Sequence, residues 1–532
     1  SNISTTTATG NGNITDLGFP NPTAYGVCWN TTGTPTISDS KVSNGAVSAT
    51  GAFSSSISGL TQGTLYYVRA YATNSAGTSY GSQVNFVYSN GDITSSQIVD
   101  PTNSDIVVNT GTTFTCSGDN QNYHSVTVLP GGKLTLADTK SLTAGTLILQ
   151  SDATGTGTFV DNNSGASPPA ITASVNQYLN SGRNWYMSSP ITNAGPGVLN
   201  GTSVVYYDEP TAVWVAKSSG TLNTMQGFIS VNTNVAGSVT FTGTLNNGSK
   251  SIVLTRTEGV NKSGFNLVGN PYPSYLNAMT AINANSNLSK TVWYRTRSTG
   301  TTPTYYFETV NTTSGIGTNN SGTGAVTGFI PPMQAFWVRA TANTTLSFDN
   351  TMRSHSTGST TLLKAPSVQT GIQRLVRLQV SNGINNDEAV VYFNPNASDG
   401  YDNYDSPKVS NANAAIPEIY TVAGAERLTI NGLNEISDNL IPLGFNNSQS
   451  GTNSFTISCT EMSNFGLNVK LYLRDNFTGD IVPLTVGESY EFSSEKYNDS
   501  QRFDIINNTS ISTGIDKLSD CNEVKVFVKN GN

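Results

Sequence analysis

Short runs of alternating polar and apolar residues, separated by turn residues, extend along most of the chain. Within residues 66–72, Tyr67, Arg69 and Tyr71 fall on one face of an extended backbone and the intervening side chains fall on the other. Segments rich in Asn and Gly, such as Asn74-Ser-Ala-Gly77, end these runs. The pattern predicts an all-β fold with under about 5% helix, against about 30–35% in an average globular protein.

The chain of 532 residues is too long for one hydrophobic core, and its runs group into five regions. The dense short strands of residues 1–88 predict a small sandwich. Residues 363–508 predict a jelly-roll-like β-sandwich, and residues 509–532 predict a linker and the truncated start of another β-domain. We therefore expect tandem β-sandwich/jelly-roll domains, with the regions 89–165 and 166–362 between them.

Very short strands and Gly-rich turns such as Pro130-Gly-Gly132 mark residues 89–165. Three of these strands, at a spacing of roughly ten residues, are Val126-Thr-Val128, Leu134-Thr-Leu136 and Leu147-Ile-Leu149. The spacing predicts one or two rungs of a β-solenoid, or a β-meander. Because the segment is too short to stand alone, we expect it to stack on a neighbouring domain.

An internal repeat organises residues 166–362. Met225-Gln-Gly-Phe-Ile-Ser-Val231 is similar to Met333-Gln-Ala-Phe-Trp-Val-Arg339. Upstream, Asn184-Trp-Tyr-Met-Ser-Ser-Pro-Ile191 is similar to Phe265-Asn-Leu-Val-Gly-Asn-Pro-Tyr272. We expect a duplicated β-unit sandwich whose two apolar faces pack on each other.

Composition and charge narrow the classes of partner. The net charge of −8 argues against nucleic acid, because phosphate recognition needs clustered Lys and Arg. No run approaches the roughly 18 apolar residues of a membrane span. Ser1 opens a polar run rather than a signal peptide, so we interpret the chain as a mature or excised piece. The four cysteines lie far apart, which favours buried thiols over a disulfide framework or a zinc site: Cys28, Cys116, Cys459 and Cys521.

Several segments of the sequence resemble segments of known secreted proteins. The N-terminal region resembles the fibronectin type III-like modules of secreted Bacteroidetes proteins. The segments that carry this resemblance are Gly26-Val-Cys-Trp29 and Tyr66-Tyr-Val-Arg-Ala-Tyr-Ala-Thr-Asn74. A second resemblance is to the C-terminal region of cargo proteins of the Bacteroidetes type IX secretion system. The segments that carry it are Pro417-Glu-Ile-Tyr420, Leu473-Arg-Asp475 and the repeated segments around Met225 and Met333. The resemblance implies an extracellular or outer cell-surface location on a Gram-negative bacterium.

The same resemblance implies a secretion partner. The passage Thr513-Gly-Ile-Asp516 leads into Val524-Lys-Val-Phe-Val528, which is similar to the start of a C-terminal sorting domain. We expect the type IX secretion translocon and its accessory proteins to recognise the segment that contains Val524, Val526 and Val528.

The sequence offers no catalytic motif. It contains two histidines, His124 and His355, and no HExxH, GxSxG or Walker A pattern. Hydrolytic carboxylate pairs on separated strands leave no sequence signature, and no pair is singled out here. We therefore expect no enzyme in this stretch.

An acidic loop is the candidate metal site. Asp399, Asp402 and Asp405 recur every third residue and could give oxygen ligands to calcium, the one cofactor we consider. The alternative is a turn in which these carboxylates accept hydrogen bonds from backbone N–H groups.

Aromatic residues are the candidate ligand site. Four tryptophans in the duplicated region could form a sugar-stacking platform, and the alternative is that they belong to a sandwich core: Trp185, Trp214, Trp293 and Trp337.

These features together predict a non-catalytic cell-surface or secreted protein that acts as an adhesin or a spacer. Its further partners would be surface glycans or ligands on a host or substratum. One alternative is a carbohydrate-binding protein, which a glycan array with Trp→Ala variants would reveal. The other is the non-catalytic C-terminal tail of a secreted hydrolase, which sequence upstream of Ser1 would reveal.

Overall fold

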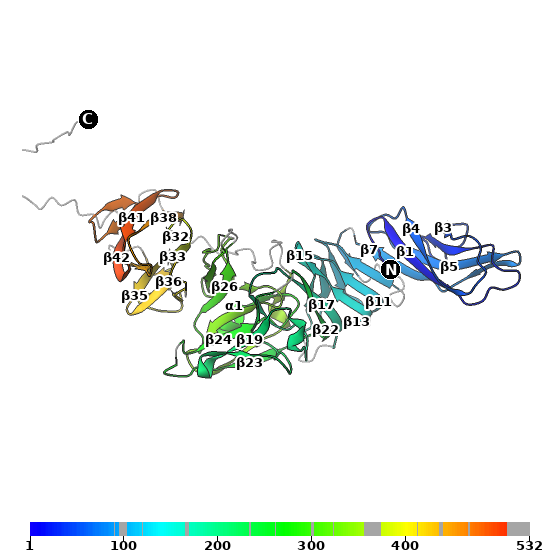
Figure 1. The fold of residues 1–532 in the computed structure, drawn as a ribbon, viewed down its shortest axis with the longest axis horizontal. Coiled ribbons are helices and arrows are strands. Elements are labelled where there is room, and N and C mark those ends of the chain that lie inside the picture. The colour runs from blue at the N-terminus through cyan, green and yellow to red at the C-terminus, as the bar shows by residue number, and fades with distance from the viewer. Residues whose placement is uncertain are drawn as a thin grey trace, which may run out of the picture. The chain divides into compact units, whose positions relative to one another are not determined.

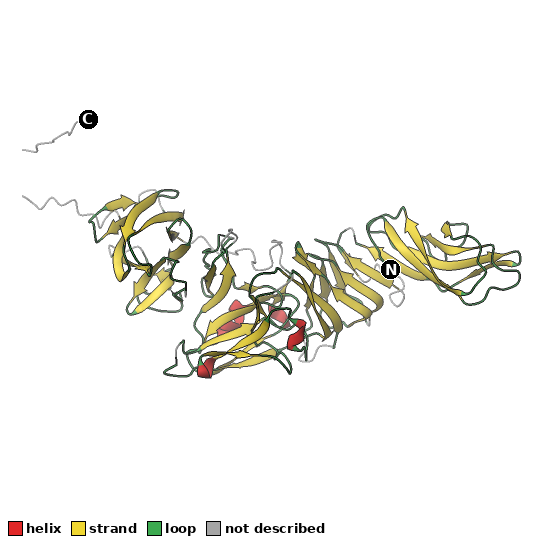
Figure 2. Cartoon of the chain, viewed as in Figure 1, coloured by secondary structure: helices red, strands yellow, loops and turns green. Residues whose placement is uncertain are grey.

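Strands dominate the computed structural model of this protein (Figure 2). Strands account for 53% of the described residues and helices for 4%, so the all-β expectation is confirmed. The structure describes residues 1–89, 91–94, 104–119, 121–164, 170–233, 236–260, 262–298, 303–322, 324–355, 374–411, 413–435, 440–465 and 469–507. Among these residues no helix is long and apolar enough to cross a membrane.

The chain divides into two compact units. The first unit comprises residues 1–297, 308–317 and 324–368, and the second comprises residues 298–307, 318–323 and 369–532. Figure 1 shows the first unit from blue to green and most of the second from yellow to red.

A small two-sheet sandwich opens the first unit (Figure 1). Its first sheet pairs β1 (Thr7–Ile14) with β4 (Gly51–Ser58). The strands of its second sheet are β2 (Ala24–Asn30), β3 (Ser40–Ser43), β5 (Tyr66–Asn74), β6 (Gly77–Tyr80) and β7 (Val84–Tyr88). Val27, Ile57 and Val68 are buried between the two sheets, as the alternating pattern of β5 and its neighbours predicts.

Two parallel sheets follow and form a short β-solenoid. One sheet has the order β16-β12-β10-β8, from Thr158–Asp161, Lys133–Leu136, Thr113–Cys116 and Ile93–Thr94. The other contains β9, β11, β13 and β17, from Ser104–Val108, Gln121–Val128, Leu142–Leu149 and Thr172–Leu179. A small hairpin, β14 and β15 (Ser151–Asp152 and Gly155–Thr156), projects from it.

Apolar side chains stack along the inside of this solenoid. Ile106 pairs with Val126, which pairs with Leu147, and Phe114 on the facing sheet pairs with Leu134. All five side chains are buried, so each coil covers the apolar surface of the next. The solenoid expectation is confirmed, and the meander alternative is wrong because the strands of both sheets pair in parallel.

One sheet runs without interruption from the sandwich into the solenoid and beyond. Its ten strands include the path β22-β17-β13-β11-β9-β7-β5-β2-β3, where β22 is Gly237–Thr244. The sandwich strand β7 pairs in parallel with β9, and Ser89 N–H donates to the carbonyl of Val107 at 2.9 Å. The predicted boundary at residue 88 therefore lies at the end of a strand that the sheet incorporates.

Two similar four-stranded sheets follow the solenoid. The first copy has the order β18-β21-β19-β20, from Trp185–Met187, Phe228–Val231, Ser203–Asp208 and Val213–Ala216. The second copy has the order β24-β29-β26-β27, from Phe265–Gly269, Ala335–Arg339, Thr291–Arg297 and Tyr305–Asn311. An antiparallel pair accompanies each copy, β17 with β22 in the first and β23 with β30 (Lys250–Leu254 and Thr344–Phe348) in the second.

The two copies meet in a reciprocal pattern of backbone contacts. Gly269 N–H donates to the carbonyl of Met225 at 2.8 Å, and Ser188 N–H donates to the carbonyl of Met333 at 2.7 Å. Met225 and Met333 occupy equivalent repeat positions, and both adopt the left-handed backbone conformation, at φ 63° and 59°. Equivalent residues thus exchange equivalent bonds, as across a two-fold axis.

The second copy carries additional elements. They are β25 (Tyr275–Asn277), α1 (Ala278–Ala284), β28 (Phe329–Ile330), the 3₁₀ turn η5 (Asn350–Met352) and β31 (Arg353–Ser354). Asn277 caps α1 by accepting from Met279 N–H, and the Lys290 ammonium donates to the carbonyls of Ile282 and Asn285 at the other end. Leu276 and Ile282 join the core of the second copy.

A buried arginine joins this second copy to the solenoid. Arg353 donates to the carbonyl of Phe159 at 2.8 Å, to Asn247 Oδ1 at 2.8 Å and to Ser274 Oγ at 3.2 Å. Its guanidinium lies over the rings of Phe159 and Tyr272. Burial lowers the pKa of Arg353 to about 10, yet the group stays charged at neutral pH.

The main body of the second unit is one β-structure around a single core. Its path of strands is β40-β39-β42-β37-β35-β36-β33-β32-β38-β41, and β34 pairs with β36. Their bounds are β32 Arg374–Ser381, β33 Asn386–Phe393, β34 Ser406–Pro407, β35 Glu418–Ala423, β36 Glu426–Leu433, β37 Ile441–Asn447, β38 Asn453–Ser463, β39 Leu471–Asp475, β40 Ile481–Pro483, β41 Ser489–Ser494 and β42 Tyr497–Asn507. Val376, Val391, Phe445 and Phe503 are among its buried residues.

Candidate functional site

An aromatic cluster on the hairpin β19–β20 is the main candidate surface. Tyr207 and Trp214 are directly opposite in the antiparallel pair. Their ring centroids lie 5.4 Å apart, and Trp337 of the second copy lies 5.2 Å from Tyr207 and 5.8 Å from Trp214. All three contacts are edge-on, a favoured geometry for aromatic pairs. We call Tyr207, Trp214 and Trp337 the aromatic cluster.

Exposure differs sharply within the aromatic cluster. Trp214 is 44% exposed, whereas Trp337 is 7% exposed and its buried Nε1 has no hydrogen-bond partner among the described residues. Burial raises the pKa of Tyr207, and the charges of Glu209 and Asp208 raise it further. Trp214 is therefore the ring of the cluster that is exposed to solvent, and Tyr207 and Trp337 pack edge-on against it.

A neighbouring turn fixes this hairpin to the second copy. Glu209 lies in the turn η4 (Glu209–Thr211) and is buried. Its carboxylate accepts from Thr257 N–H at 2.8 Å, from Gly264 N–H at 2.7 Å and from Thr257 Oγ1 at 3.0 Å. Although burial opposes it, these bonds hold the pKa of Glu209 below its usual value.

The other predicted tryptophans lie in the interior. Trp185 packs in the core of the first copy under Arg183 and donates from Nε1 to the carbonyl of Asn180 at 2.8 Å. Trp293 is fully buried beside Phe265. The structure therefore brings Trp214 and Trp337 together, and leaves Trp185 and Trp293 apart from them.

The acidic loop has the contacts that a turn requires. Asp402 accepts from the N–H groups of Ser398 and Tyr404, at 2.7 Å each. Asp405 accepts from Asp402 N–H at 2.8 Å and from Gly432 N–H at 2.9 Å, and burial raises its pKa to about 7. These are the bonds of the turn alternative.

No group of three His, Cys, Asp or Glu side chains suited to a metal ion occurs within the described ranges. Asp399 is exposed and lines a pocket of about 190 Å³ with Phe393 and Leu433. Calcium binding by Asp399, Asp402 and Asp405 stays a prediction. Equal melting temperatures in EDTA and in millimolar calcium would contradict it.

Both histidines have partners that the sequence did not reveal. His124 Nδ1 lies 2.7 Å from Asp105 Oδ1, and Ser125 Oγ donates to the same oxygen. In a hydrolytic triad the imidazole lies between the hydroxyl and the carboxylate. Here the carboxylate lies between the other two, so this contact does not activate Ser125.

His355 belongs to the joint between the solenoid and the second copy. Its Nε2 contacts Thr135 Oγ1 at 3.0 Å and its Nδ1 contacts Thr158 Oγ1 at 2.7 Å. Burial, with the charges of Lys133 and Arg353, lowers its pKa to about 3. Neutral His355 is therefore a structural residue of the joint.

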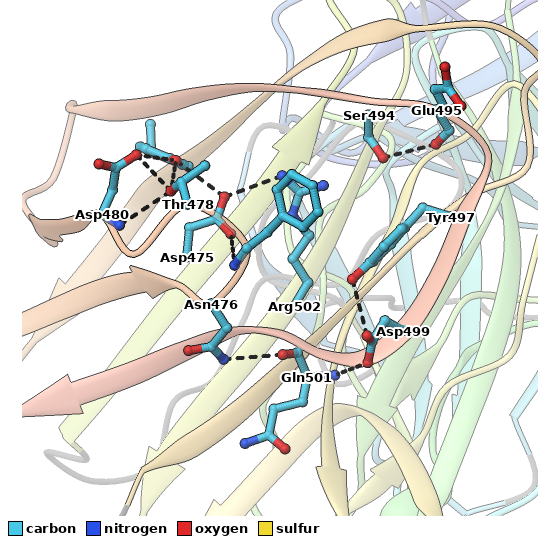
Figure 3. A network of polar contacts seen from close by, with 12 residues as sticks. Asp475, Asn476, Thr478, Asp480, Ser494, Glu495, Tyr497, Asp499, Gln501 and Arg502 are labelled. Carbon is cyan, nitrogen blue, oxygen red and sulfur yellow. Dashed lines mark hydrogen bonds and ion pairs between the residues drawn. The ribbon is translucent and has the colours of Figure 1, made fainter.

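A polar network of the second unit, around Arg502 and Asp475, is structural as well (Figure 3). Arg502 Nη2 lies 3.2 Å from Asp475 Oδ2, and both side chains are buried. The guanidinium lies 4.5 Å from the ring centroid of Phe492 and 5.1 Å from that of Phe503. Figure 3 shows Asp475 and Asp480 converging at the turn that joins β39 to β40, which this network holds against β42.

The described cysteines are buried free thiols: Cys28, Cys116 and Cys459. Burial raises the pKa of Cys116 to about 12, so this thiol is not a reactive nucleophile at neutral pH. Cys521 and the predicted secretion segment lie outside the described residues, and so do Val524, Val526 and Val528.

Comparison with known proteins gives one family match. The model of a family described as a domain of unknown function, DUF8693, matches residues 94–506, which is more than half of the chain. No curated protein matches the chain, and no solved structure matches it.

Proposed function

The chain belongs to the DUF8693 family, a domain of unknown function, and from this premise we propose that it is a non-catalytic extracellular spacer or adhesin. In this proposal the type IX secretion system exports it to the surface of a Gram-negative bacterium. The observation that carries the spacer role is the ten-stranded sheet that connects three successive regions of the first unit.

A spacer must transmit force without bending at its domain joints. Flexible linkers let neighbouring domains move independently. Here the β7–β9 ladder joins the sandwich to the solenoid by strand pairing, and Arg353 and His355 close the next joint with buried contacts. The sheet and these joints favour a stiff first unit that holds its binding surfaces at a fixed distance.

A proline at Val107 tests the stiffness of the first joint. Proline cannot donate to a ladder, and Val107 pairs with Tyr88 of β7. With fluorophores on cysteines introduced at the exposed positions Thr32 and Thr240, the parent chain should show one narrow distance distribution. Val107→Pro should broaden it, whereas the loop control Ala46→Pro should not. A broad distribution in the parent chain would contradict the spacer role.

Secretion requires a separate test, because the segment concerned lies outside the described residues. A reporter fused to the complete native C-terminus should reach the surface of a bacterium with a type IX system. A reporter ending before Ile515 should stay in the periplasm. Surface delivery of both would refute the assignment.

Carbohydrate binding is a second candidate function, and the exposed ring of Trp214 favours it. Aromatic rings stack on the apolar faces of sugars, and the edge-on contact with Trp337 would hold the exposed ring of Trp214 in place. On a glycan array, Trp214→Ala should lose binding, while Val253→Ala, at an exposed apolar control position, should keep it. Binding that survives Trp214→Ala would exclude this surface.

A further inference from the structure

Three ionisable side chains are buried together in the second unit. Asp387 lies on β33, Glu418 begins β35, and Lys408 directly follows β34. The side chain of Asp387 is fully buried, that of Lys408 is 3% exposed, and Glu418 is buried as well. Charged groups are rarely placed so deep, because losing their hydration costs several kcal/mol per ion.

The contacts of Asp387 are unequal at its two oxygens. The Lys408 ammonium contacts Oδ2, and Ile419 N–H donates to the same oxygen at 2.8 Å. Oδ1 is buried and has no hydrogen-bond partner among the described residues. Glu418 is held by other donors, since it accepts from Asn411 N–H at 2.7 Å and Asn446 Nδ2 at 3.0 Å.

The surroundings favour the uncharged acid. Burial raises the pKa of Asp387 to about 7; Lys408 opposes this rise, and the negative charge of Glu418 reinforces it. In a dry site, proton transfer from an ammonium to a carboxylate replaces two charges with a neutral amine and a neutral acid. These are the reactants of amide formation.

We propose that Lys408 and Asp387 form an intramolecular isopeptide bond. After one proton of the Lys408 ammonium has passed to Oδ1 of the carboxylate, the neutral Nζ attacks Cγ of Asp387. Oδ2 carries the developing negative charge and receives the hydrogen bond of Ile419 N–H, as an oxyanion does. The second proton of Nζ passes to Oδ1, which leaves as water.

The reaction is balanced without any further reagent. One amine and one carboxylic acid yield one amide and one water molecule, and nothing is oxidised or reduced. Holding the two groups in contact removes the entropic cost of bringing them together. The same burial keeps solvent water from hydrolysing the product.

The other described ion pairs lack one of these features. The buried pairs Arg377–Glu388 and Arg502–Asp475 use guanidinium groups, which stay protonated and are poor nucleophiles. The pair Lys140–Asp119 has an amine, but its side chains are 25% and 78% exposed. Lys408–Asp387 combines an amine, an acid and exclusion of water.

The bond would reinforce the second unit mechanically. It would link β33 to the segment after β34. Strands β33 and β34 do not pair with each other, but each pairs with β36. A covalent link limits how far the chain extends when pulled. The inference goes beyond the proposed spacer role and does not depend on export or ligand binding.

Mass spectrometry of the full chain tests the proposal. The intact denatured protein should weigh one water molecule less than its sequence, and Lys408→Arg should have its full sequence mass. Lys140→Arg is the matched control and should keep the deficit. A parent chain of full sequence mass, or a deficit that persists in Lys408→Arg, would overturn the proposal.

Peptide mapping of the parent chain locates the bond without relying on a variant that folds. Asp399, Asp402 and Asp405 lie between the two residues, so a protease that cleaves at aspartate separates their peptides. The peptide with Lys408 should stay joined to the peptide with Asp387. Separate unmodified peptides would show that the contact is an ion pair only.

Discussion

The two copies of the repeat share a framework but differ in what covers them. Their strand orders are the same, and the bonds at Met225 and Met333 are equivalent. The hairpin β19–β20 of the first copy nevertheless leaves Trp214 exposed, whereas Trp293 on β26 of the second copy is fully buried. The framework therefore accommodates both an exposed and a fully buried tryptophan, on strands that are not equivalent in the two copies.

Additional elements accompany this difference. In the second copy β25, α1, β28 and β31 lie between or after the repeat strands, and Leu276 and Ile330 contribute to its core. Among the described residues, the first copy has the short turns η3 (Pro196–Val198) and η4 between its repeat strands. The second copy thus has more elements packed on its repeat strands than the first.

The largest expected effect is at Trp293. Trp293→Ala removes a fully buried ring that packs beside Phe265. We expect a loss of about 3–5 kcal/mol in unfolding free energy, as for other buried aromatics. Chemical denaturation of the full chain would measure it. A loss below about 1 kcal/mol would contradict the covered role of the second copy.

The contact between the copies should be sensitive to one added side chain. A Cβ atom on Gly269 would lie 2.2 Å from Ser188 Cβ, so only one of these equivalent positions has room for a side chain. Gly269→Ser should cost about 1–3 kcal/mol. Adding Ser188→Gly should recover most of this loss in a double-mutant cycle. Additive losses would show that the two positions do not meet.

The joint at His355 should make stability depend on pH. Burial lowers the folded pKa of His355 from 6.5 to about 3, so the unfolded chain binds a proton first as the pH falls. This contribution is fully present above pH 6.5 and lost toward pH 3; by pH 5 the loss is about 2 kcal/mol. His355→Gln should flatten the stability profile between pH 7 and 5. Parallel profiles would contradict a neutral, buried His355.

The smallest effect on stability should be at Trp214. Its ring is 44% exposed, so Trp214→Ala should cost under about 1 kcal/mol while removing glycan binding. Denaturation and array binding, measured on one preparation, would separate stability from recognition. A loss above about 3 kcal/mol would place Trp214 in the core after all.

The sequence predicted the local features well, because they depend on neighbouring residues. The alternation of side chains in β5 indicated a strand. The similar segments around Met225 and Met333 indicated a duplication. The same patterns did not distinguish Trp214 from Trp293, since both lie within strand-like runs. Alternation shows which side chains share a face, but it contains no information about which element covers that face.

Only the tertiary structure decided which polar residues meet. The regular spacing of Asp399, Asp402 and Asp405 suggested a metal site, and the structure adds that backbone N–H groups donate to Asp402 and Asp405. Lys408 and Asp387 gave no signal, because 20 residues separate them and neither belongs to a motif. The sequence by itself determined the strands and their repetition. The pairing of strands that are distant in the sequence decided which side chains are exposed and which polar groups meet. The reason is that a site without water forms only when such strands come together.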